Sequence, residues 1–375
     1  MIPLNQNLYS LKRSQIRVYT NLAKETPDCA SLTIGEPDFD TPEIIKMAAM
    51  AALRDNQTHY APNQGTPSLR KAVAEFETAR GNATKPENVL VTIGACHGLF
   101  TALFGILNPG EEVIVPTPGF GLYETIATIA GAKTVKLDIS KTGFQIDAEA
   151  LKATITEKTK AIIINSPCNP TGTVFTKESL DTVKQAVLGK PIFVICDNVY
   201  NQLSYVDCPD LSLDEDLKEQ LILCQSFSKP YAMPGWRVGY LTCPEYVMDR
   251  LLLLSAAEIT AVPTFLQTAA EEALKTDPTP MKEEYARRRE YVCRRLDEMG
   301  LTYPAPEGAF YVFPDISKFG MGSEEFCTRM IKEGKVAAVP GGCFGSDDHI
   351  RLSYCYSMAE LEKGLDRMET FIKIL

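Results

Sequence analysis

Short apolar runs alternate with amphipathic stretches through the middle of the chain, and this alternation constrains the fold more than any other feature. The runs that read as strands are residues 89–93, 112–115, 134–137, 161–164, 192–196 and 221–225. Helical stretches lie between most of them, at residues 96–107, 122–130 and 177–187. Strands that are joined through helices form a largely parallel sheet covered on both faces. The sequence therefore predicts an α/β fold.

One connection differs from the others and predicts a change of strand direction. Residues 226–237 join the strands at 221–225 and 238–242, and they contain two prolines and a glycine in place of a crossover helix. Parallel neighbours need a long crossover, usually a helix, so we expect 238–242 to run antiparallel. The expected large domain is a mostly parallel seven-stranded sheet with one antiparallel strand, flanked by helices.

The pattern changes near residue 275. A helical stretch leads from 244 to 275, and residues 276–280 read as a boundary. Beyond it we expect a helix to 299, a strand at 310–313, a helix at 323–332, a strand at 350–353 and a helix at 358–374. Residues 1–40 offer no strand and should pack on this unit. The predicted domains are a large one at 41–275 and a smaller α+β one made of 1–40 and 276–375.

Composition excludes several partners and locations. The formal charge of −10 and the lack of a basic run argue against nucleic acid. Residues 1–10 lack the apolar centre of a signal peptide, and no apolar run is long enough for a bilayer. Eleven cysteines without C-x-x-C spacing indicate reduced thiols, and three scattered histidines predict no metal site. We expect a cytoplasmic protein that binds no membrane.

The segment Ser226-Phe227-Ser228-Lys229 directly follows a strand that should be buried. Desolvation lowers the pKa of a lysine amine and favours Schiff-base chemistry. Ser226, Ser228 and Arg237 together carry the hydroxyl and guanidinium groups that can hold a phosphate. A surface loop with a solvated lysine and arginine is the plain alternative, and this segment alone does not decide between them.

Three more polar segments follow strands of the same sheet: Gly94-Ala95-Cys96-His97-Gly98, Asn169-Pro170-Thr171-Gly172 and Asp197-Asn198-Val199-Tyr200. The first enters a helix, whose free N–H groups can cradle a phosphate. A Cys96–His97 nucleophile pair is disfavoured, because adjacent residues of a helix point apart. Taken singly, the second segment reads as a plain turn and the third as a helix N-cap. Open α/β sheets bind ligands at strand carboxyl ends, so all four segments should share one crevice.

Together these segments resemble the fold-type I aminotransferases of class I/II, which depend on pyridoxal 5'-phosphate (PLP), over essentially the whole chain. The order and spacing of Asn169, Asp197, Lys229, Arg237 and Arg351 carry the resemblance. Further matching segments are residues 32–39, 59–60, 118–120, 308–311 and 351–353. Residues 232–237 and 319–321 are most similar to bacterial aromatic or N-acetyl-diaminopimelate aminotransferases.

The resemblance implies a role for each residue around the cofactor. Lys229 forms the Schiff base and moves the proton, and Asp197 keeps the pyridine nitrogen protonated. Tyr200 and Asn169 bond the phenolic oxygen, and Phe120 stacks on the ring, although core packing also explains Phe120. The implied phosphate ligands are the N–H groups of Ala95 and Cys96 with Ser226, Ser228 and Arg237.

The resemblance also implies how the substrate and a second subunit bind. Arg351 clamps the substrate α-carboxylate, helped by Asn169 and the backbone of Gly35; an ordinary strand-end arginine is the alternative. Tyr60 reaches the phosphate of the neighbouring subunit, so that a homodimer is the working unit. The residues expected to act in catalysis are Lys229, Asp197 and Tyr200.

Some residues depart from the family's usual pattern. Asn198 stands where glutamate is usual, and residues 95–97 replace Ser-Gln-Gln-like residues. Cys168 precedes Asn169 and has no assigned role. The bonds before Pro118 and Pro170 are often cis in this family, and we predict a cis bond at Asn169–Pro170.

The predicted reaction moves an amino group from an L-amino acid, aromatic or related, to a 2-oxo acid. Candidates for the side-chain pocket are Ile16, Phe310 and Tyr311. A PLP-dependent β-C–S lyase of the cystathionine type is the alternative, because the fold and Lys229 serve both reactions. A non-catalytic PLP-binding regulator is disfavoured, because no helix-turn-helix precedes the large domain.

Overall fold

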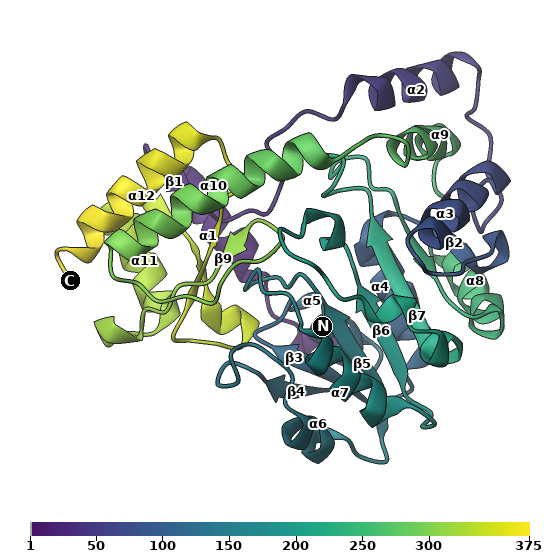
Figure 1. Ribbon diagram of the computed structural model, residues 1–375, viewed down its shortest axis with the longest axis horizontal. Helices are drawn as coiled ribbons and strands as arrows, with labels where there is room; N and C mark the ends of the chain where they lie inside the picture. Colours follow the sequence, from purple (N-terminus) through teal and green to yellow (C-terminus); the bar gives the residue numbers. More distant parts are fainter. Residues whose placement is uncertain (1) are drawn as a thin grey trace.

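The computed structural model describes residues 2–375, and its centre is a seven-stranded sheet with helices packed around it (Figure 1). The strands lie in the order β2-β8-β7-β6-β5-β3-β4. They are β2 (Val89–Thr92), β3 (Glu112–Thr117), β4 (Lys133–Asp138), β5 (Thr159–Asn165), β6 (Phe193–Asp197), β7 (Leu221–Ser226) and β8 (Gly239–Thr242). The predicted seven-stranded sheet is confirmed, with strand ends shifted by a few residues.

Strand β8 is antiparallel to both of its neighbours, as predicted. The other pairs in this sheet are parallel. Gly239, the first residue of β8, lies opposite Thr92 at the end of β2 and opposite Ser226 at the end of β7. The reversal therefore brings the segment that carries Arg237 to the sheet edge where β2 and β7 end.

Helices cover both faces of the sheet because strand side chains alternate between the two faces. On β5, Ala161 and Ile163 pack with α4 (Gly94–Ile106), α5 (Leu122–Ile129) and α8 (Glu245–Ile259). Ile162 and Ile164 of the same strand pack with α6 (Ala148–Thr154) and α7 (Lys177–Val187). Because both faces are buried, the central strands are nearly continuous apolar runs, as is typical of parallel sheets.

The helical stretch expected over residues 244–275 is interrupted. Helix α8 ends at Ile259, and α9 (Thr264–Ala273) begins directly after Pro263. Thr260 has a φ of 60°, and a proline has no backbone N–H for a continuing helix. Helix α9 packs against α2 (Glu43–Arg54) and α3 (Pro67–Ala79) at one end of the molecule (Figure 1).

A smaller α+β unit lies at the other end of the long helix α10 (Thr279–Glu298) (Figure 1). It contains the antiparallel sheet β11-β12-β9, made of β9 (Tyr311–Val312), β11 (Val339–Pro340) and β12 (Ile350–Ser353). Its other helices are α1 (Gln15–Glu25), α11 (Ser323–Gly334) and α12 (Met358–Ile372). Contrary to expectation, the N-terminal region does supply a strand, β1 (Ala30–Ser31), which pairs parallel with β10 (Val336–Ala337).

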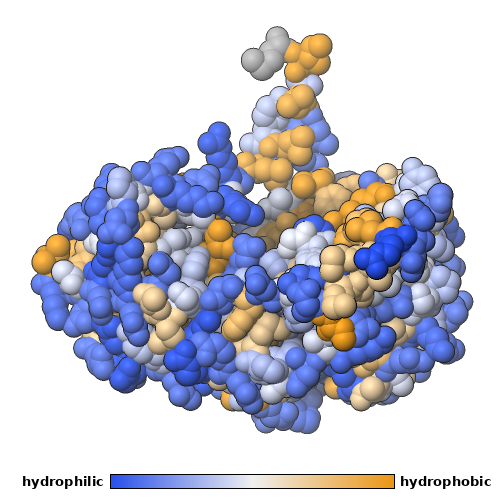
Figure 2. All heavy atoms as spheres, turned by 90° about the horizontal axis from the view of Figure 1, so that it is seen from above, coloured by the Kyte–Doolittle hydropathy of each residue, from blue (hydrophilic) through white to orange (hydrophobic). Residues whose placement is uncertain are grey.

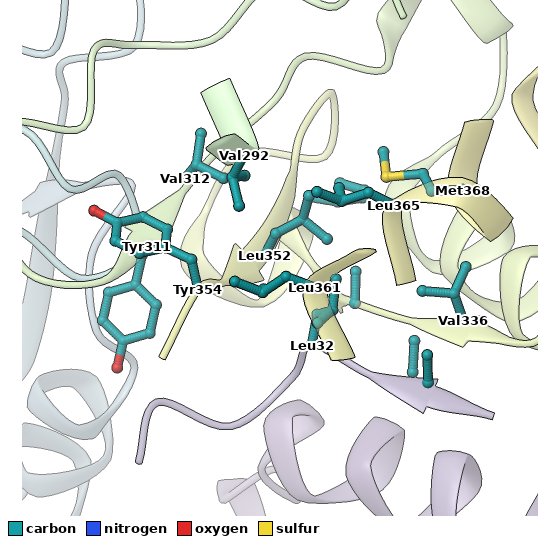
Figure 3. Packing of buried hydrophobic residues seen from close by; sticks show 14 of the residues in the cluster. Leu32, Val292, Tyr311, Val312, Val336, Leu352, Tyr354, Leu361, Leu365 and Met368 are labelled. Atoms are coloured by element: carbon teal, nitrogen blue, oxygen red, sulfur yellow. The ribbon is translucent and has the colours of Figure 1, made fainter. Parts of the chain in front are cut away.

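The N-terminal segment is held to this unit by a common core. Figure 3 shows Leu32, which follows β1, next to Leu361 of α12, and Leu365 of the same helix belongs to the same buried cluster. Seven short 3-10 helices complete the elements: η1 (Gln6–Ser10), η2 (Pro86–Asn88), η3 (Asn201–Leu203), η4 (Leu211–Leu213), η5 (Glu215–Gln220), η6 (Ser317–Phe319) and η7 (Gly341–Phe344). Among the helices of residues 2–375, none combines the length and apolar character that a membrane span requires. The predicted domain limits, 41–275 against 1–40 with 276–375, stay a prediction.

Candidate active site

The polar segments singled out in the sequence begin at one edge of the large sheet. Strands β2, β5, β6 and β7 end at Thr92, Asn165, Asp197 and Ser226. The parallel strands β5, β6 and β7 end side by side, with Asn165 opposite Asp197 and Asp197 opposite Cys224. Strand β2 reaches the same edge through β8, whose first residue lies opposite the ends of both β2 and β7. This is the edge at which open α/β sheets bind ligands.

Asp197 has a buried carboxylate of which one oxygen is satisfied and the other is free. Tyr123 of α5 donates its hydroxyl hydrogen to Oδ2 at 2.6 Å, whereas Oδ1 finds no hydrogen-bond partner within residues 2–375. Burial raises the pKa of Asp197 to about 6, and the bond from Tyr123 acts in the opposite direction. A cation beside the free oxygen would stabilise the ionised form. The protonated ring nitrogen of PLP fits this position.

Lys229 lies three residues beyond β7 and reaches the N-terminal segment. Its Nζ donates to the carbonyl oxygen of Gly35 at 2.6 Å and lies 5.7 Å from the ring centroid of Phe310. Burial lowers the pKa of Lys229 from its ordinary value, because the surroundings disfavour the charged ammonium. A lysine that loses its proton more readily is suited to attack a carbonyl carbon. Gly35, expected to help bind substrate, therefore contacts the lysine through its carbonyl group.

The groups predicted to bind phosphate meet around Gly94 and Gly239 and form a cradle at the start of α4. A Cβ on Gly94 would lie 2.5 Å from Nη2 of Arg237, and one on Gly239 would lie 3.1 Å from the nitrogen of Ala95. Only glycine allows the guanidinium and the β8 backbone to come so close to the start of α4. Ser226 is opposite Gly239, and its Oγ accepts from the N–H of Ser228 at 3.0 Å. Helix N–H groups, a guanidinium and a hydroxyl together fit a phosphate dianion.

Arg351 of β12 is a buried cation without an acidic partner in the described part of the chain. Its Nη1 donates to Oδ1 of Asn169 at 2.8 Å, and its Nη2 donates to the carbonyl oxygen of Thr33 at 2.5 Å. Its guanidinium carbon lies 4.4 Å from the ring centroid of Tyr311 and 5.1 Å from that of Phe344. Its Nε makes no hydrogen bond to any described residue. A planar cation held in this way suits a carboxylate ligand.

The remaining predicted residues occupy different surroundings. Tyr200 is buried, and its hydroxyl lies 2.8 Å from that of Tyr311, whose ring lies against Arg351. Phe120 is partly buried and meets Tyr123 edge-to-face, with centroids 5.8 Å apart. Tyr60, in contrast, is 91% exposed and makes no part of this crevice.

Of the three candidates for the side-chain pocket, only Tyr311 contacts Arg351. Phe310 is a core residue, fully buried and 5.6 Å from the Tyr200 ring and 5.3 Å from the Tyr285 ring. Ile16 is partly buried and packs against a cluster that includes Phe344. The guanidinium of Arg351 therefore lies between aromatic rings, those of Tyr311 and Phe344.

The predicted cis bond at Asn169–Pro170 is wrong. Within residues 2–375 the cis bonds are Thr117–Pro118 and Ser166–Pro167, three residues earlier in the same loop. The bond before Pro170 is trans, and this proline lies in a turn that the N–H of Gly172 closes by donating to the carbonyl oxygen of Cys168, four residues earlier, at 2.9 Å.

The two unexplained departures from the family pattern have local causes. The thiol of Cys168 is buried 3.8 Å from the carbonyl oxygen of Pro118, and burial raises its pKa to about 11. Cys168 therefore serves as an uncharged packing residue below the Pro118 loop. Asn198 donates from Nδ2 to Oδ2 of Asp210 at 2.8 Å. A negative charge therefore still lies next to position 198, on Asp210 instead of on residue 198 itself.

Two residues of this site have no signal in the local sequence. Tyr123 reads as part of a helix that covers the sheet, yet it holds Asp197 across 74 positions of the chain. Asn165 reads as the last residue of a strand. Its Nδ2 donates to the carbonyl oxygen of Asp197 at 2.8 Å, and its Oδ1 accepts from the N–H of Asn169 at 2.9 Å.

Residues 27–368 match the family model described as aminotransferase class I and II. The chain belongs to the class I and II aminotransferases. This aminotransferase is accordingly a PLP-dependent enzyme that transfers an amino group between an amino acid and a 2-oxo acid. When bound, PLP supplies the electron sink for charge that develops on the substrate. Nothing in the comparisons favours the lyase alternative.

Known proteins resemble the aminotransferase over nearly its whole length. It is 39% identical to an aspartate aminotransferase of Pyrococcus abyssi, over 99% of this chain and 98% of the relative. It is 37% identical to a probable N-acetyl-LL-diaminopimelate aminotransferase of Bacillus subtilis, over 98% and 95%. The crystal structure of an aromatic aminotransferase from Pyrococcus horikoshii matches with a TM-score of 0.89 at 38% identity, covering 95% of this chain and 99% of that one. The predicted family and fold are thus confirmed.

Proposed function

We propose that Lys229, Asp197 and Arg351 form the reactive centre of this aminotransferase. The main support is that two buried charged groups each keep an atom without a hydrogen bond in the described structure. These atoms are Oδ1 of Asp197 and Nε of Arg351. Lys229 Nζ holds the cofactor and takes the proton from the substrate Cα. Asp197 faces the ring nitrogen, and Arg351 binds the α-carboxylate together with Asn169. The proposed phosphate ligands are the N–H groups of Ala95 and Cys96 with Ser226, Ser228 and Arg237.

We further propose roles for the aromatic residues near this centre. Tyr200 bonds the phenolic oxygen of the cofactor after its hydroxyl leaves Tyr311, and Phe120 stacks on the cofactor ring. Gly35 contributes its backbone to substrate binding once Lys229 has turned to the cofactor. The support for the role of Tyr200 is its proximity to the proposed centre, because Tyr200 contacts Tyr311 and Tyr311 contacts Arg351.

The proposed amino donor is an aromatic L-amino acid. The support is the set of rings around the carboxylate clamp, since Tyr311 and Phe344 both lie against Arg351. Aromatic side chains pack well against other rings and bury a large apolar area. The relatives include aspartate as well as aromatic aminotransferases. A comparison of aspartate with aromatic amino acids as donors therefore tests the proposal directly.

A half-reaction screen tests the proposed donor. The PLP-loaded enzyme is mixed with one L-amino acid at a time, and loss of the visible absorbance of the bound cofactor is followed. Phenylalanine and tyrosine should react fastest. Fast reaction with aspartate and none with either aromatic acid would overturn the proposal. Steady release of pyruvate and ammonia from cystathionine would instead support the lyase.

We propose a homodimer as the working unit, with Tyr60 entering the phosphate site of the partner. Tyr60 is 91% exposed, and the N-terminal residues Ile2, Leu4 and Tyr9 are exposed by 89%, 66% and 64%. Figure 2 shows apolar side chains on an arm that projects from the body of the molecule. Apolar groups left in water in this way favour contact with another chain. Sedimentation equilibrium should give twice the chain mass.

The expected cytoplasmic location stays a prediction.

A further inference from the structure

His97 of α4 and Glu258 of α8 form a polar pair near the start of α4, which carries the proposed phosphate ligands Ala95 and Cys96. His97 Nε2 lies 2.9 Å from Oε2 of Glu258, and the hydroxyl of Thr101 donates to the same oxygen at 2.7 Å. The two side chains of the pair are only 11% and 16% exposed. Oε1 of Glu258 is buried and has no partner within residues 2–375. Glu258 therefore depends on His97 and Thr101 for its hydrogen bonds.

The other ring nitrogen of His97 fixes the residue at which α4 starts. Nδ1 accepts from the N–H of Ile93 at 3.1 Å, and Ile93 is the N-cap residue of this helix. A nitrogen that accepts carries no proton, so the proton of the neutral ring lies on Nε2 and faces Glu258. In a capping box, a side chain of the first helical turn accepts from the N-cap N–H in the same way. His97 thus holds the start of α4 through the N–H of its N-cap residue.

Glu258 lies next to the attachment point of the loop between α2 and α3. It precedes Thr260, the C-cap residue of α8, whose carbonyl oxygen accepts from Nδ2 of Asn63 at 2.9 Å. Thr264 donates its hydroxyl hydrogen to the carbonyl oxygen of His59 at 2.6 Å. Hydrogen bonds on both sides of Tyr60 therefore tie this loop to the segment that follows Glu258.

We propose that His97 and Glu258 are positioning residues that hold the phosphate-binding start of α4 and connect it to the loop that carries Tyr60. Cofactor binding and association of two copies then strengthen each other. This inference rests on the proposed phosphate ligands and homodimer. The contacts run from Ile93 through His97 and Glu258 to the α8 end without a gap. Coupling between two such sites is reciprocal, so each binding event tightens the other by the same factor.

The test measures two dissociation constants, that of PLP from the apoprotein by fluorescence titration and that of the dimer by sedimentation with and without PLP. His97→Leu removes both hydrogen bonds of the ring. It should weaken PLP binding about tenfold, the usual effect of losing one bond to a charged group. It should also reduce the tightening of the dimer by PLP. His97→Gln offers an acceptor for Ile93 and a donor for Glu258, and should restore most of both.

A matched pair of variants on α8 serves as the control. Glu258→Gln should weaken PLP binding several-fold, whereas Asp249→Asn changes an exposed carboxylate of the same helix and should change neither constant. Unchanged PLP affinity in His97→Leu and Glu258→Gln, with only a lower melting temperature, would overturn the positioning role. Weaker PLP binding with an undiminished effect of PLP on the dimer would overturn the connection to Tyr60. Failure of the proposed site would appear differently, as normal turnover of Lys229→Ala.

Discussion

The hydroxyl of Tyr123 donates a 2.6 Å hydrogen bond to Oδ2 of Asp197 and leaves Oδ1 without a partner in the described chain. The carboxylate is therefore held by one oxygen, and the other is free for the proposed contact with the cofactor. Tyr123 also meets the ring of Phe120 edge-to-face at 5.8 Å. One residue of α5 thus orients both the group proposed for the ring nitrogen and the group proposed for the ring face.

Tyr123→Phe should shift the pH dependence of PLP binding. The pKa of Asp197 is raised to about 6 by burial, so the apoprotein should bind PLP well above this pH and poorly below it. The Tyr123 bond stabilises the ionised carboxylate, and its loss should raise the pKa of Asp197 further. The midpoint of the binding curve should therefore move to higher pH. Fluorescence titration between pH 5 and about 8 checks this, and an unchanged midpoint would contradict it.

Lys229→Ala should abolish turnover and leave PLP bound non-covalently. The variant removes the amine, whereas the cradle around Gly94 and Arg237 is unchanged. Turnover is measured with a coupled assay, and bound PLP by its absorbance after gel filtration. Lys177→Ala, which removes a lysine of an exposed ion pair, is the control and should keep full activity. Near-normal turnover of Lys229→Ala would refute the assignment.

Arg351→Lys should raise the KM for the amino acid about a hundredfold with a smaller effect on kcat. Lysine keeps the charge but cannot form the planar two-point contact with a carboxylate, and such a loss corresponds to about 3 kcal/mol of binding. Steady-state kinetics separate the two constants. Arg329→Lys alters an exposed ion pair and serves as the control. A change in kcat alone would argue for a role other than carboxylate binding.

Asn165→Ala should lower stability as well as activity. The side chain satisfies the buried carbonyl oxygen of Asp197 and the buried N–H of Asn169 at once. Leaving both unpaired should cost about 2–4 kcal/mol. Urea unfolding followed by circular dichroism gives the free energy of unfolding. Asn7→Ala removes a single bond near the surface and should cost less than about 1 kcal/mol. Equal losses of stability in both variants would contradict the role of Asn165 in pairing the buried groups of Asp197 and Asn169.

Much of the fold follows from patterns that lie within a few residues of each other. The apolar runs and the helices between them predict the parallel strands, and the short proline-containing connection at 226–237 predicts the reversal at β8. The polar segments 197–200 and 226–229 each follow a strand, so their arrival at one sheet edge could be predicted. These features depend on the period of the hydrophobic residues, on where each strand ends and on the direction of the chain. The local sequence encodes all three.

Only the tertiary structure decided the contacts between residues that are distant in sequence. Tyr123 reaches Asp197 across 74 positions, and His97 reaches Glu258 across 161. Position 170 carries the family's expectation of a cis bond, but the cis bond of this loop lies before Pro167. Such outcomes depend on how helices and loops pack onto the sheet, and many residues far along the chain determine that packing together. The sequence by itself therefore determined the fold and the kind of site. Packing decided which side chains hold Asp197, Arg351 and the start of α4 in place.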